Sequence, residues 1–219
     1  MMRRVWLAGA AALTGCSVLP QQPYTQKRNW PLLARRPAAL PPRSAGPVLL
    51  VRSFQAAPGL ESRGLQWKLP DGSVHVDYYE QWAVPPAQAV EDALRLWLAD
   101  AGLFAAVVAA GSQLPADLTL EGELTEFQGD PQAGVARAAL ALVLLDKRPQ
   151  PVRVLLQKTE SATAPLVDTQ PPSVVRALQA ALGEVLRQTE QSLTSAALRA
   201  GEARPRALDP GVETRKRRG

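Results

Sequence analysis

The pattern of apolar and polar positions predicts one folded domain over residues 47–199. Val48–Val51 form a short apolar run that is typical of a buried strand. Residues 63–69 and 74–78 alternate apolar and polar side chains on either side of a Pro-Asp-Gly-Ser turn, which predicts a β-hairpin. A body of about 150 residues has an ordinary single-domain size and is long enough to bury a core.

Two segments have the helical spacing of apolar side chains. Pro85 and Pro86 suit the first turn of a helix, where a missing N–H costs little, and apolar residues then recur at three or four positions as far as Ala101. A second apolar stripe follows Ser173, the predicted N-cap, and loses its periodicity near Ala200. The chain is therefore predicted to contain two main helices.

Further strands are predicted between these helices. Residues 103–108 form an apolar run, and residues 118–124, 136–144 and 152–156 each place apolar side chains on one face, with turn sequences between them. Three consecutive strands with short turns predict an antiparallel meander. The order of elements predicts an α+β fold: a single domain whose mostly antiparallel sheet carries the two main helices packed on one face.

The amino end has the layout of an export signal. Arg3 and Arg4 precede an apolar stretch over residues 5–13, which is well short of the roughly 20 residues that span a bilayer. The next motif consists of Leu13, Thr14, Gly15 and Cys16. It resembles the lipobox of bacterial lipoproteins, which implies a signal peptide over residues 1–15, cleavage before Cys16, and a diacylglycerol and an acyl chain on that cysteine. The alternative is a chance cysteine beside an ordinary secretory signal.

The segments that flank the domain are predicted to lack regular structure. Residues 16–46 contain six prolines and are expected to form a tether, because proline removes a backbone donor and fixes φ. Ser17 follows the cysteine where an aspartate would mark the inner membrane, which indicates the periplasmic face of the outer membrane. Residues 200–219 end in a basic cluster and are expected to be a disordered tail that contacts anionic lipid headgroups or only aids solubility.

Few side chains suit catalysis. His75 is the only histidine and Cys16 the only cysteine, so a zinc-type site lacks further ligands of either kind, and no nucleophile elbow or Gly-rich phosphate loop occurs. Glu121 and Glu123 share a strand face, but acids on a strand surface are ordinarily solvated. The net charge of +5 would suit nucleic acid, which export excludes. We expect no catalytic residue, no metal site, no nucleic acid and no cofactor beyond the lipid.

Three aromatic residues lie just before the first predicted helix. Tyr78, Tyr79 and Trp82 either pack at a junction of sheet and helix or form a contact surface for a partner, because Tyr and Trp dominate the hot spots of protein interfaces.

The same region carries a resemblance to a known family. Residues 78–86, the helix that follows, the Phe-x-x-Val sequence at 104–107 and the strand at 117–127 resemble the ABC-type transport auxiliary lipoprotein family, to which the PqiC-like proteins belong. Two features depart from the usual pattern of the family. Gln81 stands where an arginine is usual, and Val84-Pro85-Pro86 replaces a charged residue followed by one proline.

The resemblance implies an accessory role in lipid transport. The family's systems combine an ABC permease and ATPase with periplasmic MCE-domain proteins, and the lipoprotein is implied to dock on the MCE component while Cys16 holds it at the outer membrane. The alternatives are a small lipid-binding carrier with an acyl chain between sheet and helices, an envelope-assembly lipoprotein, and a hydrolase built around His75. Whether the chain forms a homo-oligomer stays open.

Overall fold

The computed structural model describes residues 25–148 and 151–202. The predicted signal peptide, the lipobox with Cys16 and the predicted tail beyond residue 202 lie outside the described residues. Neither of the two described helices combines the length and the apolar character that crossing a bilayer requires.

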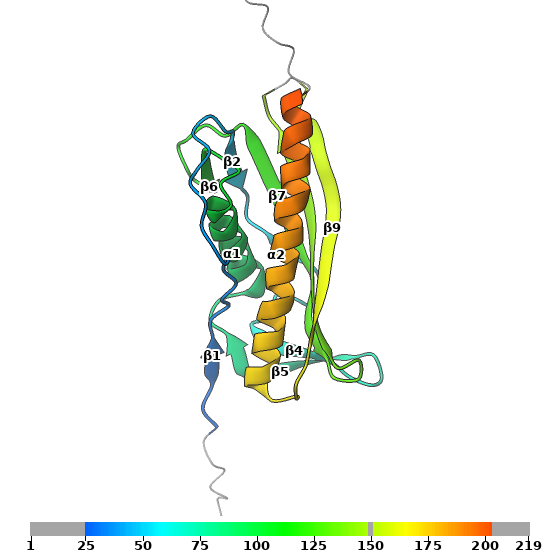
Figure 1. Ribbon diagram of the computed structural model, residues 1–219. Coiled ribbons are helices and arrows are strands. Elements are labelled where there is room, and N and C mark those ends of the chain that lie inside the picture. Colours follow the sequence, from blue (N-terminus) through cyan, green and yellow to red (C-terminus); the bar gives the residue numbers. More distant parts are fainter. Residues whose placement is uncertain (1–24, 149–150, 203–219) are drawn as a thin grey trace, which may run out of the picture.

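The described chain forms nine strands and two helices (Figure 1). The strands are β1 (Arg28–Trp30), β2 (Val48–Val51), β3 (Gln55–Ala56), β4 (Gly64–Lys68), β5 (Val74–Trp82), β6 (Ala106–Ala109), β7 (Leu118–Asp130), β8 (Val135–Asp146) and β9 (Arg153–Pro165). The helices are α1 (Pro86–Asp100) and α2 (Pro171–Glu202). The predicted hairpin, meander and both helices are thus present.

All of these strands join one mixed sheet in which β7 is the central member. On one side, β7 pairs antiparallel with β8, which pairs antiparallel with β9. On its other side, β7 pairs parallel with β2, β3 and β4 in succession. β6 extends the sheet beyond β2, and β5 and then β1 extend it beyond β4. The long pairings are antiparallel, so the prediction of a single domain with a mostly antiparallel sheet is correct. The short parallel pairings were not predicted.

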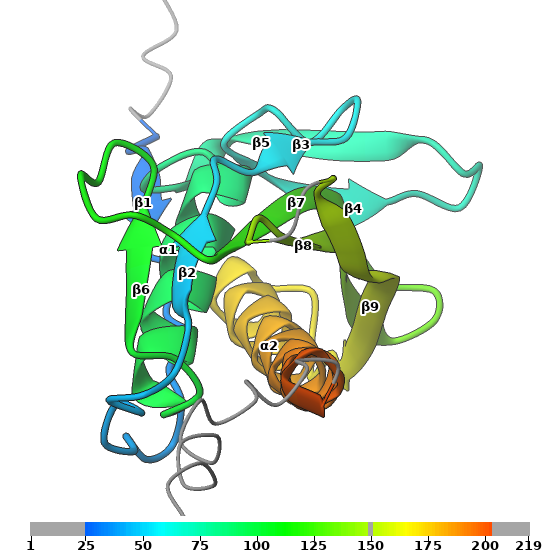
Figure 2. The same ribbon diagram turned by 90° about the horizontal axis from the view of Figure 1, so that it is seen from above.

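The sheet curves around the helices. Figure 2 shows it bending around α2, with α1 beside that helix. α2 contacts β7, β8 and β9, whereas α1 contacts β3, β6 and β7, and the two helices contact each other. The space between sheet and helices is filled by fully buried aliphatic side chains from all layers. They include Leu49, Leu94, Leu98, Leu118, Leu120, Leu124, Leu140, Leu142, Leu144 and Leu178.

The start of α2 differs from its prediction. The helix begins at Pro171, and Ser173 lies inside it as a buried residue rather than at the N-cap. The carbonyl of Gln170 accepts hydrogen bonds from the backbone N–H groups of Ser173 and Val174, at 2.9 and 3.1 Å. The two prolines at the start fit this position because neither has an N–H to satisfy.

Residues 28–46, hereafter the strap, run along the body and are not a free tether. β1 pairs with β5. The Gln179 amide donates to the Pro31 carbonyl at 2.9 Å, and the Leu40 N–H donates to the Asp100 carbonyl at 2.7 Å. The tether prediction is therefore wrong for residues 28–46, because backbone N–H and C=O groups of this segment form hydrogen bonds with the body.

The molecule has two distinct ends. β7 has 13 residues, so its two ends lie about 40 Å apart. Trp67 of β4 pairs near the Asp130 end, which carries β1 and the β4–β5 hairpin and is called the hairpin end below. Leu118 pairs with Asp146 at the opposite end, beside the start of β9. The described chain begins at the hairpin end, and α2 ends at the opposite end (Figure 1).

Candidate functional site

The three aromatic residues singled out by the sequence separate in the structure. Tyr78 and Tyr79 are 64% and 43% exposed, and their rings meet edge to face with centroids 5.2 Å apart. Trp82 is 1% exposed and packs against Phe127 at a centroid distance of 5.2 Å. The contact role is therefore wrong for Trp82, which is a core residue. Tyr78 and Tyr79, the aromatic pair, stay a predicted contact surface.

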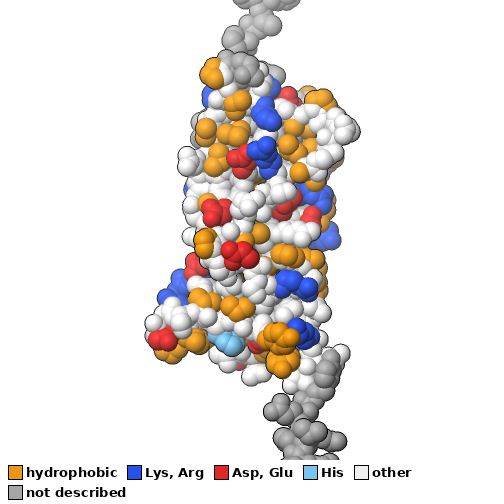
Figure 3. Space-filling model, turned by 180° about the vertical axis from the view of Figure 1, so that it is seen from behind, with side chains coloured by type: hydrophobic (Ala, Val, Ile, Leu, Met, Phe, Trp, Pro, Cys, Tyr) orange, Lys and Arg blue, Asp and Glu red, His pale blue; other side chains and the backbone are white. Residues whose placement is uncertain are grey.

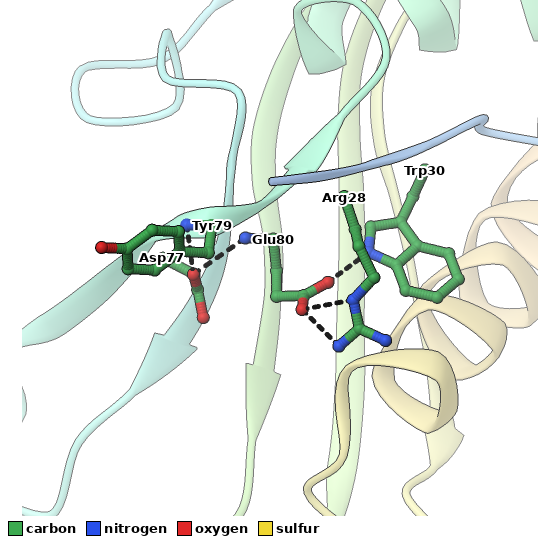
Figure 4. A network of polar contacts seen from close by, with 5 residues as sticks. All are labelled: Arg28, Trp30, Asp77, Tyr79 and Glu80. Atoms are coloured by element: carbon green, nitrogen blue, oxygen red, sulfur yellow. Dashed lines mark hydrogen bonds and ion pairs between the residues drawn. The ribbon is translucent and has the colours of Figure 1, made fainter. Parts of the chain in front are cut away.

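A bulge in β5 explains why two consecutive tyrosines are both exposed. Gly64 pairs with Gln81 and Gln66 pairs with Val76, so residues 77–80 of β5 lie opposite a single residue of β4. Such an excess interrupts the alternation of side chains between the two faces of a sheet. The Asp77 carboxylate closes the bulge by accepting the N–H groups of Tyr79 and Glu80, at 2.7 and 2.9 Å (Figure 4).

Glu80, the last residue of the bulge, is buried against the body and fixes the start of the strap. Its carboxylate accepts hydrogen bonds from the Arg28 guanidinium, with Nε at 2.7 Å, and from Trp30 Nε1 at 2.8 Å (Figure 4). Glu80 is buried, whereas the Arg28 side chain is half exposed. A buried carboxylate requires such partners, so this network ties β1 to β5.

The hairpin exposes further apolar side chains. This group, the hairpin patch, consists of Leu69, Val74, Val76, Tyr78 and Tyr79. His75 is also exposed, and Figure 3 shows it at the hairpin end with hydrophobic side chains nearby. Isolated exposed apolar residues are ordinary, but several on one hairpin indicate a contact surface.

A second polar cluster holds the middle of the strap. Glu190 of α2 accepts hydrogen bonds from Arg36 Nε at 3.1 Å and from Trp97 Nε1 of α1 at 2.7 Å. The strap and the two helices border an open groove of about 470 Å³. Leu33, Pro37, Trp97, Gln179, Gly183 and Arg187 are among its lining residues. A groove of this size is large enough for a small apolar ligand.

Two buried carboxylates with lowered pKa values, Asp130 and Asp146, take part in ion pairs. Arg148 donates from Nε and Nη2 to Asp146, each at 2.8 Å, and this hydrogen bonding holds the pKa of Asp146 below its ordinary value. The backbone N–H of Ala133 lowers the pKa of Asp130 in the same direction. Both carboxylates stay charged near neutral pH, which suits structural ion pairs rather than a general acid.

The other candidates from the sequence occupy unremarkable positions. Glu121 pairs with Arg52 at 2.6 Å, and both side chains are exposed. Glu123 is exposed on the same strand. Within residues 25–148 and 151–202, no group of three or more His, Cys, Asp and Glu side chains is arranged to hold a metal ion.

Comparison with known proteins gives the family. The sequence model described as ABC-type transport auxiliary lipoprotein component matches residues 32–189. The chain belongs to this family. The match begins in the strap after β1 and ends inside α2, so it covers β2 to β9, α1 and the first part of α2. The chain is therefore a transport auxiliary lipoprotein. The name of the family associates such proteins with an ABC transport system. No curated protein matches the sequence.

Solved structures share the fold. A crystal structure of a DUF330 protein from Xanthomonas campestris has a TM-score of 0.65 at 23% identity, covering 78% of this chain and 95% of that one. A crystal structure of an uncharacterized protein has a TM-score of 0.62 at 15% identity, covering 77% and 99%. At these identities the likeness concerns the fold alone.

The structure shows what Gln81, one of the two departures noted in the sequence, contacts. Gln81 takes the usual place of an arginine, and its amide donates to the Tyr78 carbonyl at 2.9 Å inside the bulge. The sequence patterns do not single out Arg28, Glu80 or Glu190 as functional residues. Glu80 and Glu190 gave no local signal, because each looks like a surface acid until a partner at least 50 residues away reaches it.

Proposed function

We propose that this auxiliary lipoprotein is a non-enzymatic docking subunit of an ABC transporter system that moves lipid between the inner and outer membranes. Lipid on Cys16 holds it at the periplasmic face of the outer membrane, and the body binds the MCE-domain protein of the system, which works with the permease and ATPase. The observation that carries this proposal is the family match over residues 32–189, together with the lipobox upstream of it.

The arrangement of the strap supports the docking role. The Arg28–Glu80 and Arg36–Glu190 pairs hold the strap at two places, so the chain between Cys16 and the body is short. A body held in this way stays within about 40 Å of its anchor. That restriction suits a subunit whose task is to stand at one membrane and meet a partner that arrives from the other.

The test is purification of the full-length lipidated protein from envelopes in mild detergent, with partners identified by mass spectrometry. We expect an MCE-domain protein or its permease to be enriched. Cys16→Ser is the matched control, because it removes the anchor and leaves every described residue unchanged. Recovery of secretion or lipopolysaccharide machinery in place of transporter components would overturn the proposal and favour an envelope-assembly lipoprotein.

The groove beside the strap favours one second candidate, a small lipid-binding carrier. Its place differs from the expected one, because it lies between the strap and the helices and not between the sheet and the helices. Gly183 borders the groove and has open space where a Cβ would be, so Gly183→Leu would fill the groove without a clash at the Cβ. The carrier role predicts lipid in organic extracts of the wild-type protein and at least a severalfold loss in Gly183→Leu. Equal lipid in both would exclude this groove as the site.

A further inference from the structure

We infer that the hairpin end of the body rests on the headgroup region of the bilayer that holds Cys16, with the aromatic pair at the contact. This inference rests on the proposed lipidation and goes beyond it, because an anchor alone does not decide which side of the body faces the bilayer. It assigns a lipid surface, rather than a protein, to Tyr78 and Tyr79.

The chain leaves the body beside the aromatic pair. Lys27 Nζ lies 3.6 Å from the centroid of the Tyr78 ring. The next residue, Arg28, begins β1 and is held by Glu80. Because β1 is fixed to β5, the segment that leads back to Cys16 must start from the hairpin end.

The length of that segment limits the orientation of the body. Eleven steps lead from residue 16 to residue 27, which span at most about 40 Å when fully extended. α2 has 32 residues and runs from the hairpin end to the opposite end (Figure 1), a length of about 48 Å. With the opposite end standing on the bilayer, Lys27 would lie about 40–48 Å away from it, at or beyond the full extension of the segment. The hairpin end is the end that the anchor can bring to the membrane.

The hairpin patch has the chemistry of a membrane interface. Tyrosine combines an apolar ring with a polar hydroxyl and is enriched where hydrocarbon meets headgroups. Lys27 and Lys68 flank the patch, and Asp71 and Asp77 balance them with carboxylates that accept hydrogen bonds from Ser73, Tyr79 and Glu80. The contact therefore depends on apolar and aromatic surface more than on charge.

Because the protein is anchored, a weak contact is sufficient to hold the hairpin end on the bilayer. Once Cys16 is in the bilayer, docking of the hairpin is an intramolecular step, and short linkers give effective concentrations in the millimolar range. Without the anchor, this exposed patch of five side chains would bind vesicles poorly. With the anchor in the bilayer, the same patch can be docked for most of the time.

The experiment measures the distance of each end from the lipid. Full-length lipidated protein carrying Ser73→Cys in the hairpin turn, or Val152→Cys at the opposite end, is labelled with a thiol-reactive fluorophore. Both proteins are reconstituted into phosphatidylcholine vesicles that contain nitroxide-headgroup phosphatidylcholine. We expect strong quenching at position 73 and little at position 152. High salt should leave both values nearly unchanged, because charge contributes little.

Variants then test the aromatic pair. Tyr78→Ser with Tyr79→Ser should lower the docked-to-undocked ratio about tenfold, because two large apolar surfaces leave the contact. Val154→Ser is the matched control, since Val154 is an exposed apolar residue near the opposite end, and it should leave quenching unchanged. Both tyrosines are exposed, so thermal unfolding should stay close to wild type and exclude misfolding as the cause.

Vesicle flotation separates the inference from the proposed function. If the protein floats with the vesicles but positions 73 and 152 are quenched equally, docking is wrong and the lipoprotein proposal stands. If the protein does not float, the anchor is wrong and the inference falls with it. If quenching at position 73 is absent and the tyrosine variant instead loses a copurifying protein, the aromatic pair binds protein and not lipid.

Discussion

At the scale of single residues, the exposed tyrosines depend on a glycine in the neighbouring strand. A Cβ built on Gly64 would lie 2.3 Å from the backbone carbonyl oxygen of Asp77 and 2.6 Å from Val76 Cγ1. The Asp77 oxygen belongs to the bulge backbone, so it cannot give way as the tip of a flexible side chain would. Gly64 thus permits the close approach that lets β5 carry its extra residues.

Gly64→Ala should therefore destabilise the fold by about 1–3 kcal/mol, the usual cost of overpacking. Chemical denaturation measures the free energy of unfolding. Gly183→Ala is the matched control, because nothing lies within 4 Å of the added Cβ, and a helical Gly→Ala change should stabilise by up to about 1 kcal/mol. Equal free energies of unfolding for Gly64→Ala and the wild type would show that the bulge adapts.

A second residue-scale prediction concerns acid. The pKa of Asp146 is lowered in the folded state, chiefly by the Arg148 side chain, from an ordinary value of about 3.9. A depressed carboxylate pKa contributes stability that is present above the unfolded value and is lost as the pH falls through the folded value. Asp146→Asn should therefore lose less stability than the wild type when the pH is lowered below about 4.

The measurement is thermal unfolding of wild type and Asp146→Asn between neutral pH and the acid limit. Arg148→Met provides the comparison, because it removes the first cause of the lowered pKa and leaves the carboxylate in place. In Arg148→Met the folded pKa of Asp146 lies closer to its unfolded value, so the acid loss of stability contributed by Asp146 should be smaller and should be complete at a higher pH. Parallel acid profiles for all three proteins would mean that the ion pair contributes nothing to stability.

At the scale of elements, sequence patterns predicted the helices and strands whose signal lies within one short segment. The β4–β5 hairpin, α1 and the meander of β7, β8 and β9 are each specified by alternation, helical spacing or turn residues within one short segment. β1 has only three residues in a proline-rich stretch and pairs with β5 some 50 residues later, so no window of sequence contains its signal. Parallel pairings such as β2 with β7 are hidden for the same reason.

The candidate site illustrates the same limit. The sequence placed Tyr78, Tyr79 and Trp82 together and left packing and contact as alternatives for the whole group. The structure divides the group, because the bulge resets the alternation between Val76 and Gln81 and directs Trp82 into the core. A bulge is a property of the register between two strands, so it could not be deduced from one strand alone.

The strap gives a prediction at this scale. Glu190→Ala removes the acceptor shared by Arg36 and Trp97, whereas Glu190→Gln keeps an acceptor for Trp97 and removes the charge. We expect Glu190→Ala to lower the free energy of unfolding by about 1–3 kcal/mol and Glu190→Gln to lower it by less, because a buried donor without a partner is costly. Hydrogen exchange at residues 31–40 should speed up in Ala more than in Gln. Unchanged exchange in both would mean that β1 and the hydrogen bonds at Pro31 and Leu40 hold the strap without Glu190.

At the scale of the whole molecule, the proposed anchor and the inferred membrane contact of the body would act together. In the proposed function the lipid is at one end of a short segment, while the strap fixes the other end of that segment to the body and the hairpin patch lies beside this fixed end. In the proposed function Ser17 acts as the address that selects the membrane, so a different residue there would leave lipid, strap and body unchanged. Both membranes face the periplasm, so the body would also keep its orientation to its own bilayer.

Ser17→Asp tests this separation. In an enteric-type host we expect the variant to move from the outer-membrane to the inner-membrane fraction of a density gradient while keeping its acyl label and its thermal stability. In the proposed function lipid transport should then fail, because a segment that reaches at most about 40 Å would keep the body at the inner membrane. Ser17→Thr, which adds no charge, is the control. Full transport from a variant confined to the inner membrane would mean that the outer-membrane position has no role, and that the body acts beside the permease.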